Sequence, residues 1–236
     1  MGYVWTKIQH VFNNQQDEGE LYHPFTNLFQ SGIPTELSAK QKFYEQVFHM
    51  LIQIADIEIT YDPILTGKEV PEFLKLREEV FKNPKESIPA LTALKDQRPD
   101  FPEIANVLTF AHIQCREFLK AEKLIQETYE RNPDYLFAKI NYADQLLRKG
   151  KKKQVAAVFN EQFDLKSLYP DRKVFHYSEA RGFFVVMSFY HLAMKQKAKA
   201  EEYYHLAMKV DPCHLSVIAL EKKLFSSRWK WFKILS

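Results

Sequence analysis

The sequence predicts an all-α protein, built as a stack of antiparallel helix pairs with one further helix at its C-terminal end. Apolar residues recur at helical spacing along most of the chain, for example at Phe43, Val47 and Ile54. Pro99 and Pro133 each end a predicted helix pair and lie 34 residues apart. Only 6 of the 236 residues are Gly, which disfavours a hairpin-rich β protein and a glycine-rich phosphate loop alike.

The last predicted pair, residues 181–212, carries a known repeat pattern. Three large residues and one small residue match the spacing W-x2-L-G-x2-Y in its first half, namely Phe184, Met187, Ser188 and His191. The positions that follow in its second half are Ala200, Tyr204, Ala207 and the closing Pro212. The segment resembles a tetratricopeptide repeat, a helix–turn–helix unit of about 34 residues. This resemblance implies an α-solenoid of degenerate repeats, in which each helix pair stacks on the next.

The chain is expected to divide into three parts. Residues 1–67 are predicted to form a helical extension that docks on the array, with helices over residues 3–16 and after an N-cap at Ser38. Residues 68–212 hold about four tetratricopeptide-like pairs. Residues 213–236 form a capping helix and a basic, aromatic tail, because a solenoid needs a terminal element with a polar outer face.

The repeat spacing slips in the second half of the array. The interval from Pro133 to Pro170 is longer than the one from Pro99 to Pro133, and the interval from Pro170 to Pro212 is longer again. The excess over two regular repeats is about 11 residues, and it falls near 164–179. We expect these extra residues to form a longer loop on one face of the stack, where repeat proteins place insertions.

Two further segments have a local pattern. Residues 57–61, Ile-Glu-Ile-Thr-Tyr, alternate in polarity, and a short strand and a frayed helix end fit this pattern equally well. Val155, Phe159 and Phe163 predict the apolar face of the second helix of the third pair.

Charge is unevenly distributed along the chain. The net charge is +3, but residues 1–100 carry −5 and residues 101–236 carry +8. The densest basic run, Arg148–Lys153, falls in a predicted turn between two helices. A solvated turn is the simplest interpretation, and binding of phosphate or of an acidic partner is the alternative. Because no aromatic platform accompanies the run, nucleic acid is not an expected partner.

No catalytic motif is present: the sequence lacks H-E-x-x-H, G-x-S-x-G, a P-loop and G-x-G-x-x-G. His112 and Cys115 could lie on one helix face as metal ligands, but His112 occupies the slot that takes Tyr in the repeat. His191 occupies the same slot, so core packing is the simpler interpretation of both histidines. Cys213 and His214 begin a predicted helix, which could lower the pKa of the thiol, but no second nucleophile partner is in view, so an inert thiol is the simpler interpretation. We therefore expect a protein that is not an enzyme and has no cofactor or metal.

The predicted location is the cytoplasm. The two cysteines are too few for a disulfide framework, which favours a reducing compartment. The N-terminal residues do not form a signal peptide, and no run of about 18 apolar residues could span a membrane.

In tetratricopeptide arrays the first helices of the pairs line a concave groove that holds a peptide, and the resemblance implies the same here. The residues that it places in the groove are mainly apolar: Asn106, Phe110, Ile113, Gln114, Ile140, Asp144, Leu147, Arg148, Val185, Phe189 and Leu192. Phe110 stands where a carboxylate clamp would have its second Asn, so the groove is expected to take a helix or an extended hydrophobic segment instead. The alternative is that residues 1–60 of the chain itself cover the groove.

These features predict a non-catalytic adaptor or chaperone-like module whose partner is another protein. The alternative function is a regulatory scaffold subunit that its basic, aromatic C-terminus recruits to a membrane surface. The tail residues concerned are Arg228, Trp229, Lys230, Trp231, Phe232 and Lys233. Continuation of the capping helix and self-association into a homo-oligomer are the other interpretations of the tail.

Overall fold

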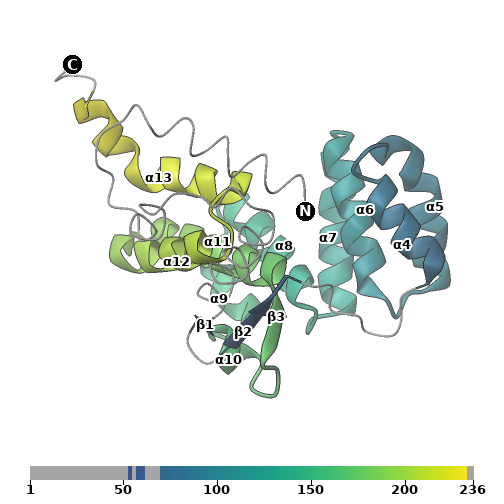
Figure 1. Cartoon of the computed structure of the whole chain (residues 1–236), viewed down its shortest axis with the longest axis horizontal. Coiled ribbons are helices and arrows are strands. Elements are labelled where there is room, and N and C mark those ends of the chain that lie inside the picture. Colours follow the sequence, from purple (N-terminus) through teal and green to yellow (C-terminus); the bar gives the residue numbers. More distant parts are fainter. Residues whose placement is uncertain (1–52, 55–56, 62–69, 233–236) are drawn as a thin grey trace, which may run out of the picture.

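A computed structural model of the chain describes residues 53–54, 57–61 and 70–232, and this part is mostly helical (Figure 1). The helices predicted over residues 3–16 and after Ser38 lie outside the described residues. The elements in order are β1 (Gln53–Ile54), β2 (Ile57–Thr60), α4 (Pro71–Glu79), α5 (Pro84–Gln97), α6 (Pro102–Gln114), α7 (Phe118–Arg131), α8 (Leu136–Arg148), η1 (Lys152–Gln154), α9 (Val155–Val158), α10 (Leu165–Leu168), β3 (Val174–His176), α11 (Tyr177–Ala193), α12 (Lys197–Val210) and α13 (Leu215–Phe232).

Four of these helices repeat with a constant shift along the sequence. α5 begins at Pro84 and α7 at Phe118, and both helices are 14 residues long. α6 begins at Pro102 and α8 at Leu136, and both are 13 residues long. The shift is the same for the two pairs of helices, and it equals the interval between Pro99 and Pro133 from which the repeat was predicted.

The same turn follows α6, α8 and α11. Each turn contains one residue with a left-handed backbone, at Arg116 (φ 59°), Gly150 (φ 72°) and Lys195 (φ 64°). In each turn the next residue donates its backbone N–H to a carbonyl in the last turn of the helix, at 2.8 Å every time: Glu117 to His112, Lys151 to Leu146, and Gln196 to His191. This is the helix-ending arrangement in which glycine is favoured, because other residues meet a steric cost there. The three helices therefore end in equivalent ways, despite the longer interval before α11.

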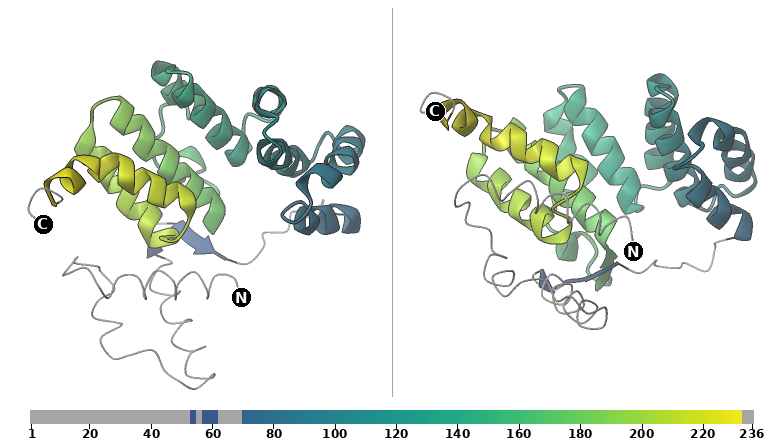
Figure 2. Two further views of the ribbon diagram at one scale, coloured as in Figure 1. Left: turned by 90° about the horizontal axis from the view of Figure 1, so that it is seen from above. Right: turned by 45° about the horizontal axis from the view of Figure 1, so that its top comes forward.

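The described helices follow one another in space in their chain order, from α4 and α5 at one end to α13 at the other (Figure 2). Their apolar side chains form two core clusters. One cluster lies among α4, α5, α6 and α7, where the rings of Phe73 and Phe101 meet edge to face at 4.9 Å. The other is built on α8 to α13 and the sheet. Tyr129 of α7 stacks on Tyr142 of α8 with 4.5 Å between ring centroids, and so joins the two blocks.

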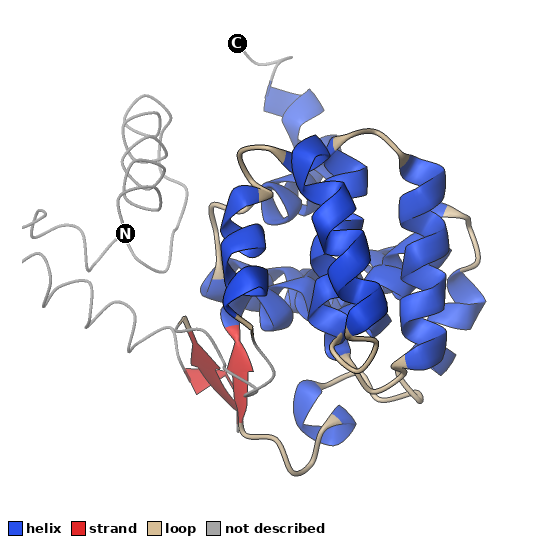
Figure 3. Cartoon of the chain, turned by 90° about the vertical axis from the view of Figure 1, so that its right-hand side faces the viewer, coloured by secondary structure: helices blue, strands red, loops and turns tan. Residues whose placement is uncertain are grey.

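A three-stranded sheet departs from the predicted all-α class. β2 pairs in parallel with β3, with Ile59 opposite Phe175, and antiparallel with β1 (Figure 3). Ile57 and Ile59 are buried while Glu58 is exposed, so the alternation in this segment is that of a strand with one covered face. A segment near the N-terminus is thereby joined to one that lies far later in the sequence.

The insertion between α9 and α11 is more ordered than the loop that we predicted for residues 164–179. It contains the short helix α10 and the strand β3. The second helix of the third pair is reduced to η1 and α9, because Asn160 and Glu161 both take left-handed backbone conformations (φ 51° and 59°) and end it. Phe159 remains fully buried. The insertion thus takes the place of most of a helix, and it supplies the strand to which β2 binds.

The helix predicted after Pro212 is present as α13 and extends to Phe232. It packs on the array through Val217, Leu220 and Leu224, which are all buried. Lys222 and Lys223 are exposed, as expected for the outer face of a terminal helix.

Candidate partner-binding surface

The predicted groove residues lie on α6, α8 and α11, and we call the side of these helices that bears them the first-helix face. Its most open part is the C-terminal half of α6, where Ile113 is 41% exposed and Gln114 is also exposed. Phe110 is half-buried, and its ring lies 5.1 Å from the ring of Phe81, in the turn after α4. Phe81 itself is 71% exposed. These three apolar residues, Phe81, Phe110 and Ile113, form what we call the Phe110 patch.

Sequence reasoning missed Phe81 as a member of this surface. The residue lies in a turn between helices, and no periodicity extends through that turn. The structure reveals it through the contact of its exposed ring with Phe110, since a contiguous apolar patch, unlike a single exposed residue, marks an interaction site.

Asn106, the one amide expected deeper in the groove, makes a hydrogen bond within the protein. Its Oδ1 accepts a hydrogen bond from Nδ2 of Asn141 at 2.8 Å, which connects α6 to α8. A cavity of about 10 Å³ lies beside this pair and is lined by Asn106, Thr109, Tyr135 and Asn141 among others. That volume suits one water molecule. Burial also holds the pKa of Tyr135 well above its usual value, so its hydroxyl stays neutral.

Two residues predicted to line the groove are in the core instead. Ile140 is 7% exposed and Val185 is 8% exposed. The reason is the close approach of α8 and α11 at Gly182, where an added Cβ atom would lie 3.3 Å from two carbon atoms of Ile140. Glycine permits this close approach, which covers the middle of the predicted groove.

The remaining groove candidates are only partly available. Asp144 and Arg148 pair with each other across one helical turn, at 2.9 Å between Arg148 Nε and Asp144 Oδ2. The other three are half-buried at the margin of the core that contains α8 and α11: Leu147, Phe189 and Leu192. The first-helix face therefore presents apolar surface mainly at α6 and becomes increasingly covered toward α11.

Neither histidine of the Tyr slot is arranged as a metal ligand. His112 is 8% exposed and donates from Nδ1 to Oε2 of Glu117 at 2.6 Å. His191 is 3% exposed and donates from Nδ1 to Oε1 of Gln196 at the same distance. Within the described ranges, no three or more His, Cys, Asp or Glu residues are grouped so that they could hold a metal ion.

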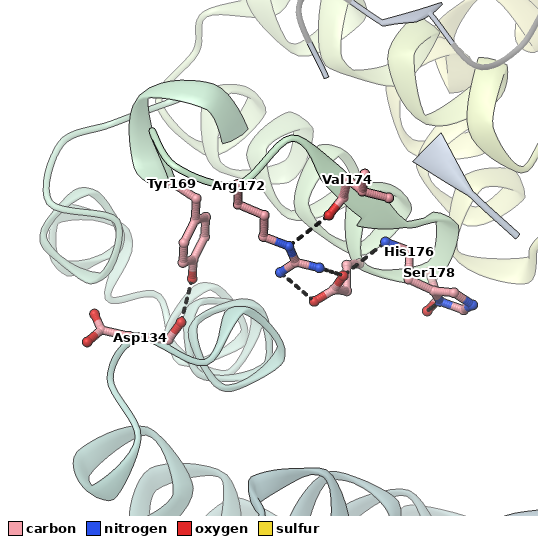
Figure 4. Close-up of polar contacts among 7 residues, drawn as sticks. Asp134, Tyr169, Arg172, Val174, His176 and Ser178 are labelled. Atoms are coloured by element: carbon pink, nitrogen blue, oxygen red, sulfur yellow. Dashed lines mark hydrogen bonds and ion pairs between the residues drawn. The ribbon is translucent and has the colours of Figure 1, made fainter. Parts of the chain in front are cut away.

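A buried ion pair in the insertion was not predicted. The guanidinium group of Arg172 binds both carboxylate oxygens of Glu179, and its Nε donates to the carbonyl of Val174 at 2.9 Å (Figure 4). Glu179 also accepts from the backbone N–H of His176 at 3.0 Å, which caps the start of α11. The cluster holds β3 against α11, because Arg172 binds both Val174 of β3 and Glu179 of α11. The capping-box spacing from His176 to Glu179 was the sequence feature from which the role of Glu179 could have been predicted.

The C-terminal tail can be placed only in part. Residues 228–232 belong to α13, and Lys233 lies outside the described residues. In the described part of the chain, no helix is both long enough and apolar enough to cross a membrane.

The comparisons with known proteins do not assign a function to this surface. No protein-family model and no curated protein matches the sequence. A solved structure described as "MamA RS-1 ArsTM double mutant" is similar at a TM-score of 0.44 and 14% sequence identity, over 66% of this chain and 83% of that chain. At this TM-score the similarity supports no conclusion about fold or function.

Proposed function

We propose that this protein is a non-catalytic, tetratricopeptide-like interaction module of the cytoplasm, and that it binds a segment of another protein on its first-helix face. The constant shift between corresponding helices of neighbouring pairs and the three equivalent turns support the repeat architecture. The observation that carries the proposed site is the Phe110 patch, in which an aromatic residue that is 71% exposed lies against an aromatic residue of α6.

The occupant that fits this surface is an amphipathic helix or an extended segment with apolar anchors. Aromatic side chains at an open patch supply most of the binding energy in such interfaces, because their burial removes a large apolar area from water. The three residues of the patch are all apolar, and Arg148, the cation predicted in the groove, pairs with Asp144. We therefore propose recognition by apolar burial rather than by charge.

The test is a quantitative pull-down followed by a measurement of affinity for the partner that is identified. The variant F81D/I113D should retain at least tenfold less partner than the wild type, because each carboxylate would have to be buried in the interface. L215D is the matched control, since Leu215 is also 71% exposed but begins α13. If F81D/I113D and L215D bind the identified partner with the affinity of the wild type, the proposed site is wrong.

The tail provides the alternative function, a scaffold subunit recruited to a membrane. Deletion of residues 228–236 separates the two proposals. Loss of the protein partner after this deletion, with the Phe110 patch intact, would favour the tail.

A further inference from the structure

A second surface lies along the ends of the helix pairs and is separate from the Phe110 patch. It consists of the turns after α6, α8 and α11 with the first residues of the helices that follow, and we call it the turn edge. Two contacts join the turns into a row. Lys149 Nζ lies 2.8 Å from Glu122 Oε2 on α7, and Lys152 Nζ donates to the carbonyl of Ala193 at 2.7 Å. The three turns are therefore neighbours, although they lie far apart in the sequence.

The turn edge concentrates positive charge that the fold does not neutralise. Five of its cations are exposed and, within the described part of the chain, have no carboxylate partner: Arg116, Lys151, Lys153, Lys195 and Lys199. The opposite ends of the helices carry an acidic residue in each turn instead, at Asp100, Asp134 and Asp211. The opposite edge thus mixes acidic residues with exposed cations such as Arg131 and Lys209, whereas the five cations named above are gathered on the turn edge.

Helix stability accounts for part of this arrangement, because Arg116, Lys151 and Lys195 follow the C-terminal ends of α6, α8 and α11, where the helix macrodipole favours positive charge. Lys197 and Lys199 differ, since they lie in the first turn of α12, where the macrodipole disfavours positive charge. Neither α7 nor α12 has an acidic residue in its first turn, whereas α4, α5 and α6 each have a Glu there. Lys197 and Lys199 therefore occupy positions that helix stability does not explain.

Two apolar side chains project from the same edge. Phe118 is 54% exposed and Leu119 is 84% exposed, and they lie at the start of α7, just after Arg116. A bulky apolar pair that projects this far from a turn, next to several cations, matches the interface of a bilayer, where apolar groups enter the headgroup region and Lys or Arg bind anionic lipids. A folded acidic partner would need a deep pocket for each of the two side chains.

We propose that the turn edge docks the protein on an anionic lipid surface, with Phe118 and Leu119 inserted among the headgroups and Lys151, Lys153, Lys195 and Lys199 above them. This docking is peripheral and uses neither the Phe110 patch nor the C-terminal tail. It would present the first-helix face to a protein partner at the membrane.

The test is co-sedimentation of the full chain with vesicles of phosphatidylcholine containing about a third of phosphatidylserine. The wild type should bind these vesicles, lose binding as salt is raised from about 0.1 to 0.5 M, and bind pure phosphatidylcholine at least tenfold more weakly. F118S/L119S should bind roughly tenfold more weakly, and K151E/K153E more weakly still, since each cation near such a surface contributes about fivefold.

Matched controls use the opposite edge of the array. L215S removes an apolar residue of similar exposure, and R131E/K209E reverses two exposed cations near the ends of α7 and α12. Both variants should sediment with the vesicles as the wild type does. W229S/W231S, which alters the tail, should also retain binding.

Three outcomes would overturn the proposal. The wild type could fail to bind the anionic vesicles, or the turn-edge variants could bind as well as the wild type while W229S/W231S does not. The third is that a poly-glutamate peptide binds the turn edge while vesicles do not, which would assign the edge to an acidic polypeptide. Circular dichroism of each variant shows that a loss of binding is not a loss of folding.

Discussion

The imidazole Nδ1 of His191 lies 2.6 Å from the side-chain oxygen of Gln196, and His112 and Glu117 make the equivalent contact in the turn after α6. In both places a histidine in the last turn of a helix binds the residue that begins the next helix of the pair. Each contact lies inside a turn and holds together the two helices that the turn connects. The repetition of this detail in two separate turns supports the repeat architecture independently of the helix bounds.

The burial of His191 makes the free energy of unfolding depend on pH. Burial lowers the pKa of His191, although the hydrogen bond to Gln196 opposes the change. The unfolded chain, with a histidine pKa of about 6.5, therefore takes up a proton at a higher pH than the folded chain does. The free energy of unfolding contributed by His191 is complete above about pH 6.5 and is lost as the pH falls through the folded-state pKa. Urea unfolding of H191F at pH 7.5 and pH 5.5 should show a smaller difference than that of the wild type. An unchanged difference, with the exposed His205 replaced as the control, would contradict this account.

The ion pair between Arg172 and Glu179 should be costly to break. Glu179 has a side chain that is 9% exposed and binds Arg172 with both oxygens. E179Q leaves the half-buried guanidinium of Arg172 without its charge partner, so we expect a loss of about 1–3 kcal/mol in the free energy of unfolding. The exposed Glu202 provides the control, since E202Q should change the value by less than about 0.5 kcal/mol. Denaturant titration gives both values, and similar values for the two variants would refute the structural role of the pair.

The close approach of α8 and α11 predicts different effects of two substitutions at Gly182. A Cβ atom there would lie 3.3 Å from Cδ1 and from Cγ2 of Ile140, so the Ile140 side chain would have to shift by a few tenths of an ångström. G182A should therefore stay within about 1 kcal/mol of the wild type, because the gain in helix propensity offsets the tighter packing. G182L should cost about 2–3 kcal/mol. Combining G182A with I140V removes the contact with Cδ1, one of the two, and should give a higher melting temperature than I140V and G182A would give if their effects were additive; a lower one would contradict the packing described.

Substitutions at the left-handed turn residues should raise the stability of the protein in one case and lower it in another. K195G should raise the free energy of unfolding by about 0.5–1 kcal/mol, because glycine adopts this backbone (φ 64°) without a steric cost. G150A should lower it by about 1 kcal/mol for the reverse reason, since nothing lies within 4 Å of the added Cβ atom. Thermal unfolding measured by circular dichroism decides both, and a loss of stability in K195G would show that the two turns are not equivalent.

The sequence was informative wherever a residue's role depends on its own helix. The proline spacing predicted the repeat period, and the Tyr slot correctly placed His112 and His191 in the core. It could not resolve the segment 57–61, because the strand there exists only through its pairing with β3, far along the chain. The sequence also could not show that Ile140 is buried, because this burial depends on Gly182 of a different helix.

The candidate surface shows the same limit. The sequence marked Phe110 and Ile113 from the repeat pattern, but Phe81 joins them only through the packing of the turn after α4 against α6. Phe118 and Leu119 gave no sequence signal, because apolar residues at the start of a helix usually point into the core. Their exposure depends on which way α7 faces in the array.

The most direct test of the central claim is hydrogen–deuterium exchange of the full chain with and without the protein partner that the pull-down identifies. The account predicts slower exchange in residues 106–117 of α6 and its turn and in residues 79–83 around Phe81, with little change in residues 164–176. Protection confined to the insertion or to α13, with α6 exchanging as in the free protein, would contradict it.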